Sequence, residues 1–356
     1  MKERSVLFLT SGRQAPSSRF RVLQYLDLLR ADGWTATFAP CVPDKFASHR
    51  EWPGGILADG VLTGAKVLSR LWSALKAPSH EIVYIERELI PYVCPEPEQF
   101  VRCLNPTIVF DFDDAVYLNY PAENNPIPKV LGMAEAVIAG NEILGTWAIS
   151  HTDRVWVLPT PIDTERYAMR ASGGDGTLLV WTGSASNLKY LASIAPALIA
   201  TKKRHPGLVL RVICDRPPPA DLGLPVEFVP WSEEVEVEAV RTADIGLMPL
   251  DNDEWCLGKC GYKLLQYMSC GLASVASPWG IVSDMLDAGR CGLPAQDLEE
   301  WADNLDLLIS QPELRETIGA SARDHAERIY SRRVLYPRWR EVLESVREKT
   351  VEKRFG

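Results

Sequence analysis

The sequence lacks a membrane-spanning run, a signal-peptide pattern at its start and an excess of positive charge. No stretch approaches the ~18 continuous apolar residues that a spanning helix requires. The first ten residues, MKERSVLFLT, lack the longer apolar region and small-residue cleavage site of a secretory signal. A formal net charge of -9 argues against general nucleic-acid binding, which needs a basic surface to neutralise phosphates. We therefore expect a cytoplasmic protein without a transmembrane segment.

Several familiar site motifs are also missing. Neither GxGxxG nor GxxxxGK[ST] follows a strand-like run, which weakens dehydrogenase and P-loop interpretations. The histidines show no metal-ligand spacing and no pairing with a Ser or Cys nucleophile signature. Cys256 and Cys260 lack a second Cys/His pair, and most of the 8 cysteines lie in apolar runs, as reduced cysteines do. We therefore predict no metal site and no cofactor.

What the sequence does contain is a regular alternation of apolar strand-like runs and helical segments. A chain of 356 residues that is 46% hydrophobic and 24% charged is typical of a soluble protein with two domains. The predicted strands are residues 5–10, 34–40, 82–85, 107–110, 136–139 and 155–158, then 177–181, 209–214, 226–229, 245–248 and 273–277. This pattern predicts an α/β fold with two doubly wound parallel sheets, each binding ligand at its carboxyl edge.

The helices and domain boundaries follow from the same pattern. Ser17 and Ser18 are predicted to cap a helix that ends at Gly33, and further helices are predicted at residues 65–77, 95–104, 142–149, 187–204 and 232–242. Proline breaks the pattern at residues 159–161, and residues 171–176 are small and flexible in type. We expect an N-terminal domain (1–163), a C-terminal domain (164–330) and a final helix (331–356) that packs back toward the N-terminal domain.

Residues 251–280 are the most informative stretch. A glycine-containing turn precedes an apolar helical segment that Gly271 can end with a left-handed cap. The start of such a helix favours an anion, because its N–H groups are unpaired and its dipole is positive there. Lys259 and Lys263 add two positive charges within about one helical turn of this position. The sequence therefore predicts a phosphate site; the alternative is a surface loop with two solvated lysines.

Charged and aromatic side chains follow other predicted strands. Asp113 and Asp114 follow a strand at the sheet edge, where carboxylates can act as acids or bases or hold Mg²⁺, as in phosphatases with an Asp-x-Asp motif. Helix capping is the simpler interpretation of both. Arg13 follows the first strand and can bind an anion or be solvated, whereas Trp231 can cover a flat ring or pack in the interior.

Taken together, the chain resembles the family 4 glycosyltransferases of the GT-B fold over nearly its full length. The resemblance is carried by residues 243–250, 259–271 and 274–280, with support from 17–21, 110–115, 139–142 and 158–163. It implies two Rossmann-like domains that face each other across a cleft. It also implies a retaining, metal-independent hexosyltransferase that moves a sugar from a nucleoside diphosphate to an acceptor hydroxyl.

The resemblance also implies roles for individual residues. The residues it places near the donor are Gly12, Arg13, Gly183, Ser184, Trp231, Lys259, Cys260, Gly261, Tyr262 and Gln266, with Gln266 at the ribose. Those it places at the chemical step are Asp113, Asp114 and Lys263.

The sequence departs from the family pattern at two positions, because Gly258 and Gln266 stand where members commonly have glutamates. Two alternatives stay open. One is another enzyme class, a nucleotide-sugar epimerase or phosphatase, and the other, which these departures favour, is a non-catalytic nucleotide-sugar-binding subunit. The acceptor also stays open between a glycan, a lipid-linked molecule and a small molecule, and peripheral membrane contact is compatible with the sequence.

Overall fold

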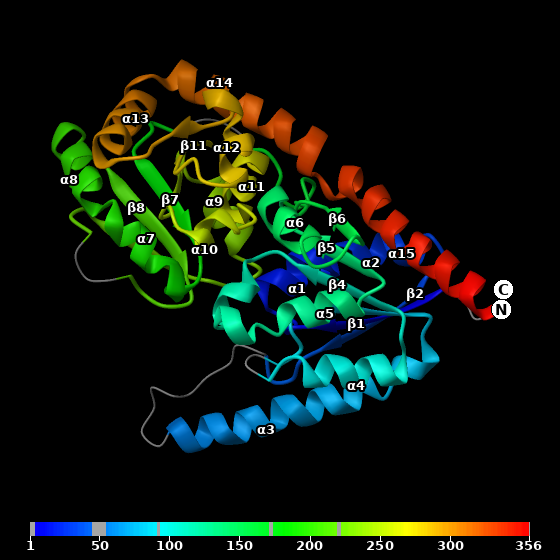
Figure 1. Cartoon of the computed structure of the whole chain (residues 1–356). Helices are drawn as coiled ribbons and strands as arrows, with labels where there is room; N and C mark the ends of the chain where they lie inside the picture. Colours follow the sequence, from blue (N-terminus) through cyan, green and yellow to red (C-terminus); the bar gives the residue numbers. More distant parts are fainter. Residues whose placement is uncertain (1–3, 45–54, 91–92, 171–173, 219–221, 356) are drawn as a thin grey trace. The chain divides into compact units, whose positions relative to one another are not determined.

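The computed structural model describes residues 4–44, 55–90, 93–170, 174–218 and 222–355. The chain divides into two compact units, an N-terminal unit of Met1–Pro161 with Leu335–Gly356 and a C-terminal unit of Ile162–Val334. Each unit contains a six-stranded parallel sheet with helices on both faces (Figure 1). The prediction of two doubly wound α/β sheets is therefore confirmed.

The N-terminal sheet has the strand order β2-β1-β3-β4-β5-β6. Its strands are β1 (Ser5–Thr10), β2 (Thr35–Pro40), β3 (Ile82–Glu86), β4 (Ile108–Phe112), β5 (Ala136–Ala139) and β6 (Val155–Val157). The inner strands are apolar on both faces because helices cover both sides of a parallel sheet. These helices are α1 (Pro16–Arg21), α2 (Leu26–Ala31), α3 (Gly55–Ala74), α4 (Glu96–Leu104), α5 (Ile127–Met133), α6 (Glu142–Ile149) and most of α15 (Arg332–Phe355).

From Leu335 onward, the last helix belongs to the N-terminal unit. Its apolar side chains join those of β1, β3 and α2 in one buried cluster. Trp339 stacks on Phe8 with ring centroids 6.0 Å apart, and its Nε1 donates to the hydroxyl of Tyr84 at 3.1 Å. The C-terminal end of the chain therefore completes the core of the N-terminal unit.

The C-terminal sheet has the order β12-β11-β10-β7-β8-β9. Its strands are β7 (Leu178–Thr182), β8 (Val209–Cys214), β9 (Val226–Pro230), β10 (Ile245–Met248), β11 (Ala273–Ala276) and β12 (Leu293–Pro294). One face packs against α7 (Leu188–Ser193), α8 (Ala195–Arg204) and α13 (Leu298–Ser310). The other packs against α9 (Glu236–Arg241), α11 (Tyr262–Ser269) and α12 (Ile281–Leu286), with α14 (Pro312–His325) contacting both clusters. A short helix, α10 (Glu254–Leu257), precedes the turn before α11.

Several predicted helices have different boundaries in the structure. The helix predicted to run to Gly33 is interrupted at Val22, and Ser18 lies inside α1, where its hydroxyl donates to Glu86 instead of capping. The helix predicted at residues 187–204 is divided at Ile194, and the one predicted at 65–77 begins at Gly55 because two internal glycines do not break it. The predicted flexible stretch 171–176 lies partly outside the described residues.

Candidate donor-binding site

The strand order of the C-terminal unit locates its ligand-binding edge. Strands β8 and β9 lie on one side of β7, and β10, β11 and β12 lie on the other. The chain therefore changes direction between β7 and β10, and ligands of doubly wound sheets bind beyond the carboxyl ends of strands at such a point. Gly183 and Ser184 follow β7 directly, and the loop that leads to α11 follows β10.

Helix α11 is fixed at this edge by Tyr267. Its buried hydroxyl donates to the carbonyl oxygen of Leu247 in β10 at 3.1 Å and accepts from the backbone N–H of Thr182 in β7 at 3.2 Å. The ring lies so close to Gly246 that a Cβ at that position would approach ring carbons to 2.4 Å. One aromatic side chain thus sets the distance from α11 to both strands, and with it the position of the start of α11.

The start of α11 is a tight turn at Gly261. Gly261 is the N-cap residue and has φ +69°, a left-handed conformation that favours glycine. A Cβ on Gly261 would lie 2.7 Å from the Sδ atom of Met285 in α12, so the turn packs closely on that helix. Because glycine has no side chain to cap the helix, the first-turn N–H groups can be bonded by an anion.

Lys263 joins this turn to the end of β7. Its Cε atom lies where a Cβ on Gly183 would approach to 2.7 Å, and its Nζ lies 5.7 Å from the ring centroid of Trp181. Gly183 therefore provides the space through which Lys263 passes. The structure brings together three positions that are far apart in the sequence, namely Gly183, Gly261 and Lys263.

Lys259 contacts a different group of side chains from Lys263. Its Nζ is 3.4 Å from Oδ1 of Asn187 and 5.7 Å from the ring centroids of both Tyr190 and Trp255. Aromatic faces attract a cation, so these contacts help to position the ammonium group. Asn187 also donates to the hydroxyl of Ser184 at 2.8 Å, which connects Lys259 to the end of β7.

The remaining predicted donor residues of this unit differ in exposure. Cys260 is half-buried within the turn, and Tyr262 is half-buried at the first position of α11. Trp231 directly follows β9, where its backbone N–H donates to Cys214 and its half-buried ring packs on the core.

Gln266 is 2% exposed, and its Nε2 donates to the hydroxyl of Tyr167 at 2.8 Å and to Oε1 of Glu236 at 2.9 Å. The side-chain amide nitrogen of Gln266 is therefore used inside the protein, and a ribose contact would have to use its carbonyl oxygen.

Polar side chains at the carboxyl edge of the sheet in the N-terminal unit are joined by hydrogen bonds. The carboxylate of Glu86 accepts from the N–H and hydroxyl of Ser11 and from the hydroxyl of Ser18, at 2.8–3.1 Å. Ser18 in turn accepts from the N–H of Gly12, a position where a Cβ would overlap Asp44. Arg13, the next residue, is exposed. This network positions the loop from which Arg13 extends.

Asp113 and Asp114 are held by Arg87, which follows β3. Arg87 donates to Asp113 at 2.9 Å and also to Asp114. Burial alone would lower the pKa of Arg87, but the carboxylates beside it hold that pKa well above its ordinary value. Arg87 has φ +57°, a conformation rare for residues with a side chain and frequent at functional sites.

Neither Asp113 nor Asp114 caps a helix, since Ala115 precedes the next helical turn. A strand-end position can be recognised in the sequence, but the pairing with Arg87 cannot.

The chain is similar to known glycosyltransferases. Residues 176–311 match the family model described as Glycosyl transferases group 1. The chain is 27% identical over 233 residues to a D-inositol 3-phosphate glycosyltransferase of Saccharomonospora viridis, covering 56% of this chain and 53% of that protein. It is also 27% identical over 254 residues to the protein of the same name from Stackebrandtia nassauensis, covering 59% and 56%. The chain thus spans about half the length of the curated relatives it matches.

Solved structures extend the likeness to both units. Sucrose-phosphate synthase from Thermosynechococcus elongatus has a TM-score of 0.71 at 13% identity, covering 97% of this chain and 99% of that one. Anabaena HepE in complex with UDP and glucose has a TM-score of 0.63 at 13% identity, covering 98% and 99%. At these identities the likeness establishes the fold, which is GT-B.

The resemblance to family 4 glycosyltransferases of the GT-B fold is therefore confirmed, and it is carried in the C-terminal unit by the match of residues 176–311 to the glycosyl transferases group 1 model.

Proposed function

We propose that this chain is a hexosyltransferase that transfers a sugar from a nucleoside-diphosphate donor to an acceptor hydroxyl, with retention and without a metal ion. The observation that supports it most is the arrangement at the start of α11. There, Lys263 crosses Gly183 at the end of β7, and Lys259 lies beside Asn187. Two ammonium groups and a helix start at a topological switch point form a site for a diphosphate.

The chemistry follows from the charge that develops during transfer. The bond between the anomeric carbon and the diphosphate oxygen breaks, and its electron pair goes to that oxygen. The acceptor oxygen bonds to the anomeric carbon and loses its proton. Lys263, Lys259 and the first N–H groups of α11 would stabilise the departing diphosphate more strongly in the transition state than in the ground state. In this proposal they supply the positive charge that a divalent cation supplies in other transferases.

The N-terminal unit would supply the acceptor side in this proposal. Arg87 holds Asp113 and Asp114 at the end of β4, and the side chain of Asp114 is the more exposed of the two at 22%. We assign Asp114 to the acceptor hydroxyl and Asp113 to positioning through Arg87. Substitution of Asp114 by Asn should lower transfer while leaving donor hydrolysis less affected.

The decisive experiment offers UDP-sugars to the purified chain, because several solved neighbours are complexes with UDP or UDP-glucose. Release of UDP and labelling of an added acceptor pool are measured for the wild type, Lys263→Ala and Lys203→Ala, where Lys203 is an exposed lysine of α8. We expect Lys263→Ala alone to reduce turnover sharply in a folded protein. Equal turnover in all three proteins would reject the assignment. UDP binding without any turnover would instead favour a non-catalytic binding subunit.

Retention and metal independence are tested by two separate measurements. Retention rests on the family resemblance, and the anomeric configuration of the product, read by NMR, tests it. Metal independence predicts that Mg²⁺ or Mn²⁺ added to metal-stripped protein leaves kcat unchanged. A cation requirement, together with release of inorganic phosphate from a phosphate ester and no transfer of sugar to an acceptor, would favour the phosphatase alternative.

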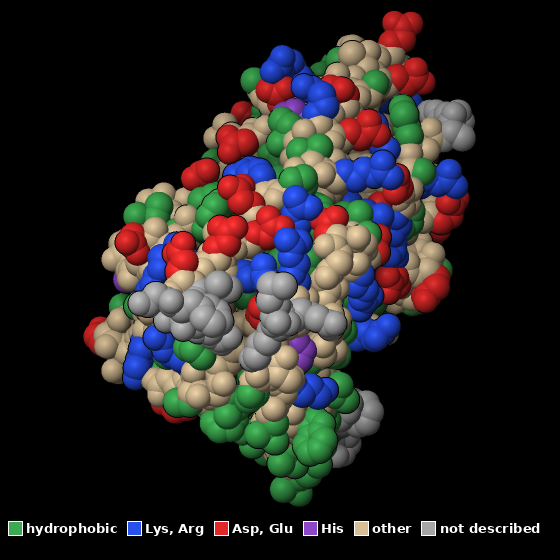
Figure 2. Space-filling model, turned by 90° about the vertical axis from the view of Figure 1, so that its right-hand side faces the viewer, with side chains coloured by type: hydrophobic (Ala, Val, Ile, Leu, Met, Phe, Trp, Pro, Cys, Tyr) green, Lys and Arg blue, Asp and Glu red, His purple; other side chains and the backbone are tan. Residues whose placement is uncertain are grey.

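We further propose a cytoplasmic location with peripheral membrane contact through α3. All eight cysteines are free thiols, which fits a reducing compartment. Among the described residues, no helix is long and apolar enough to cross a membrane. Helix α3 nevertheless exposes large apolar side chains along its length, namely Ile56, Leu57, Val61, Leu68, Leu71 and Trp72, followed by Leu75. Figure 2 shows such side chains gathered at its lower end, the level at which α3 lies in Figure 1.

The exposed face of α3 has the character of a helix that lies in a membrane interface. Leu57 is 80% exposed and Trp72 is 71% exposed, and both lie on one face together with Val61 and Leu68. Trp72 and the exposed Lys76 stand near one end, where an indole and a long cationic side chain favour the headgroup layer. Because the face is mostly apolar, binding should depend more on apolar insertion than on lipid charge.

Vesicle co-sedimentation tests this contact. The wild type should bind both zwitterionic and anionic vesicles, and the double variant Leu68→Glu/Trp72→Glu should lose binding by at least about tenfold. Ile149→Glu, at an exposed apolar residue beyond α3, is the matched control and should bind normally. The wild type could instead fail to bind vesicles and form a dimer in sedimentation analysis. If the double variant then loses the dimer, α3 is a contact between two copies of the chain.

A further inference from the structure

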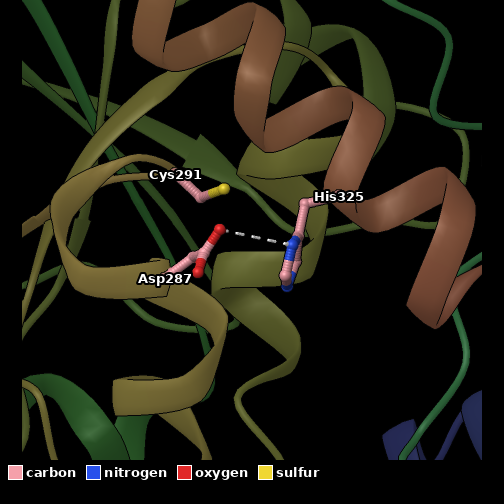
Figure 3. A group of neighbouring side chains, drawn as sticks. All are labelled: Asp287, Cys291 and His325. Atoms are coloured by element: carbon pink, nitrogen blue, oxygen red, sulfur yellow. Dashed lines mark ion pairs between the residues drawn. The ribbon is translucent and has the colours of Figure 1, made fainter.

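A second group of chemically active side chains lies in the C-terminal unit, apart from the lysines. Asp287 and Cys291 follow α12, and His325 ends α14. One ligand atom from each lies within 4.8 Å of the others, and Oδ2 of Asp287 is 3.9 Å from Nδ1 of His325. Figure 3 shows the three side chains pointing toward one another from these two segments. A carboxylate, a thiol and an imidazole are thus gathered at one point.

We propose that Asp287, Cys291 and His325 bind one zinc ion or a similar borderline transition-metal ion, with a water molecule in the fourth position. Cys, His and Asp are the ligand types that zinc takes, and three protein ligands with one solvent position are a common set. Bond lengths of ~2.0–2.3 Å in a tetrahedron place ligand atoms roughly 3.3–3.7 Å apart. The three groups therefore need to move together by about 1 Å, which side-chain rotation provides.

The backbone at Asp287 is shaped to present the carboxylate. Three consecutive residues, Asp287, Ala288 and Gly289, have positive φ values of +48°, +53° and +90°. Two of them are not glycine, and L-residues rarely adopt this conformation. The turn returns the chain so that Cys291 lies beside Asp287 only four residues later. A bound ion would stabilise this turn against the end of α14.

The surroundings orient the proposed ligands. Arg290 donates to Oδ1 of Asp287 at 2.6 Å, which leaves Oδ2 toward His325, as a hydrogen-bonded carboxylate ligand is commonly oriented. His325 is buried, and its ring lies 5.8 Å from the ring of Tyr330, measured between centroids. The thiol of Cys291 donates to the carbonyl oxygen of Ser321 at 3.6 Å, and metal binding would release the thiol proton.

The ion would have a structural role close to the candidate donor site. Asp287 is the C-cap residue of α12, and Met285 and Ile281 of this helix pack against the Gly261 turn. Fixing the end of α12 to α14 would therefore support the turn that precedes Lys263. The inference does not rest on the proposed function, because it is tested by metal binding.

The test titrates Zn²⁺ and Co²⁺ alone into the metal-stripped full chain. We expect one ion per chain, a thiolate-to-cobalt charge-transfer band in the near ultraviolet, and a thermal midpoint raised by roughly 5–10 °C at a hundredfold excess over Kd. Cys291→Ser should abolish the band, and Cys291→Ser and His325→Gln should each weaken Zn²⁺ binding by at least about 100-fold. Arg290→Gln, which removes the bonds from the guanidinium to the carboxylate and the backbone oxygen of Asp287, should weaken it by roughly tenfold.

Matched controls make the result decisive. Cys103→Ser and His151→Gln alter an exposed cysteine and an exposed histidine of the N-terminal unit, and both should bind Zn²⁺ as the wild type does. Circular dichroism confirms that each variant is folded, and His325→Gln provides a second test if Cys291→Ser is not. A cobalt band or a Zn²⁺ affinity that is unchanged in a folded Cys291→Ser or His325→Gln variant would overturn the proposal. Failure of the wild type to bind either ion would do the same.

Discussion

The two sheet edges use charge in different ways. At the N-terminal edge, arginines are paired with carboxylates: Arg21 with Asp111, and Arg87 with Asp113 and Asp114. At the C-terminal edge, Lys259 and Lys263 lie beside aromatic rings, which attract a cation and help to hold it in place. In the proposed function, positive charge at the first edge maintains structure, whereas positive charge at the second edge binds ligand.

The largest effect should come from breaking the buried ion pair of the N-terminal unit. Arg21→Met leaves Asp111 buried with its main cationic partner removed, so this unit should lose about 3–5 kcal/mol of unfolding free energy. Urea unfolding followed by Trp fluorescence measures it. Arg30→Met, at an exposed arginine of α2, is the control and should change stability by less than about 0.5 kcal/mol. If Arg21→Met leaves the unfolding free energy nearly unchanged, the positive charge of Arg21 does not maintain the structure of this unit.

Gly183→Ala should affect both stability and activity, by an intermediate amount. The new methyl group would meet the Lys263 stem and the buried Trp181 ring, so unfolding free energy should fall by about 1–3 kcal/mol. Displacement of Lys263 should also lower kcat. Gly207→Ala is the control, because its Cβ would make only an ordinary contact, at 3.6 Å from Thr177. If both variants behave alike, the packing of Lys263 on Gly183 does not matter.

Lys259→Ala should weaken donor binding by about tenfold, equivalent to about 1.4 kcal/mol, with little change in unfolding free energy. Its contacts include the amide oxygen of Asn187 and the rings of Tyr190 and Trp255, which lie beside the start of α11, where the proposal places the diphosphate. Isothermal titration with UDP and a parallel thermal melt measure the two quantities. If the variant loses stability but binds UDP normally, Lys259 maintains structure and does not bind the donor.

The smallest effect concerns pH and the docking of α15. The hydrogen bond from Tyr336, together with Arg340, holds the pKa of Asp32 below its ordinary value. A lowered folded-state pKa gives stability that is present above the unfolded value of about 3.9 and is lost as pH falls through the folded value. Asp32→Asn should therefore flatten the acid side of the stability profile below about pH 4, as thermal melts across pH would show. An unchanged acid limb would argue against this contribution.

The sequence predicted the fold class because strand and helix periodicity is local. The phosphate site at Lys259–Lys263 stays a prediction, and it could be made because glycines, lysines and the following apolar segment lie within one short stretch. Pairings between distant residues could not be predicted. Arg87 meets Asp113 from 26 positions away, Gln266 meets Tyr167 from 99, and His325 lies 34 positions beyond Cys291. Backbone conformation was also inaccessible, since nothing in the residue types marks Ala288 or Arg87 for a positive φ.

The most direct test of the central claim is the affinity for UDP of the Lys259→Ala/Lys263→Ala double variant, measured by isothermal titration beside wild type and Lys203→Ala. If the start of α11 holds the diphosphate, the double variant should bind at least about 100-fold more weakly, at roughly tenfold for each lost charge contact. Lys203→Ala should match the wild type. A double variant that is folded and binds UDP within about threefold of the wild type would contradict the account.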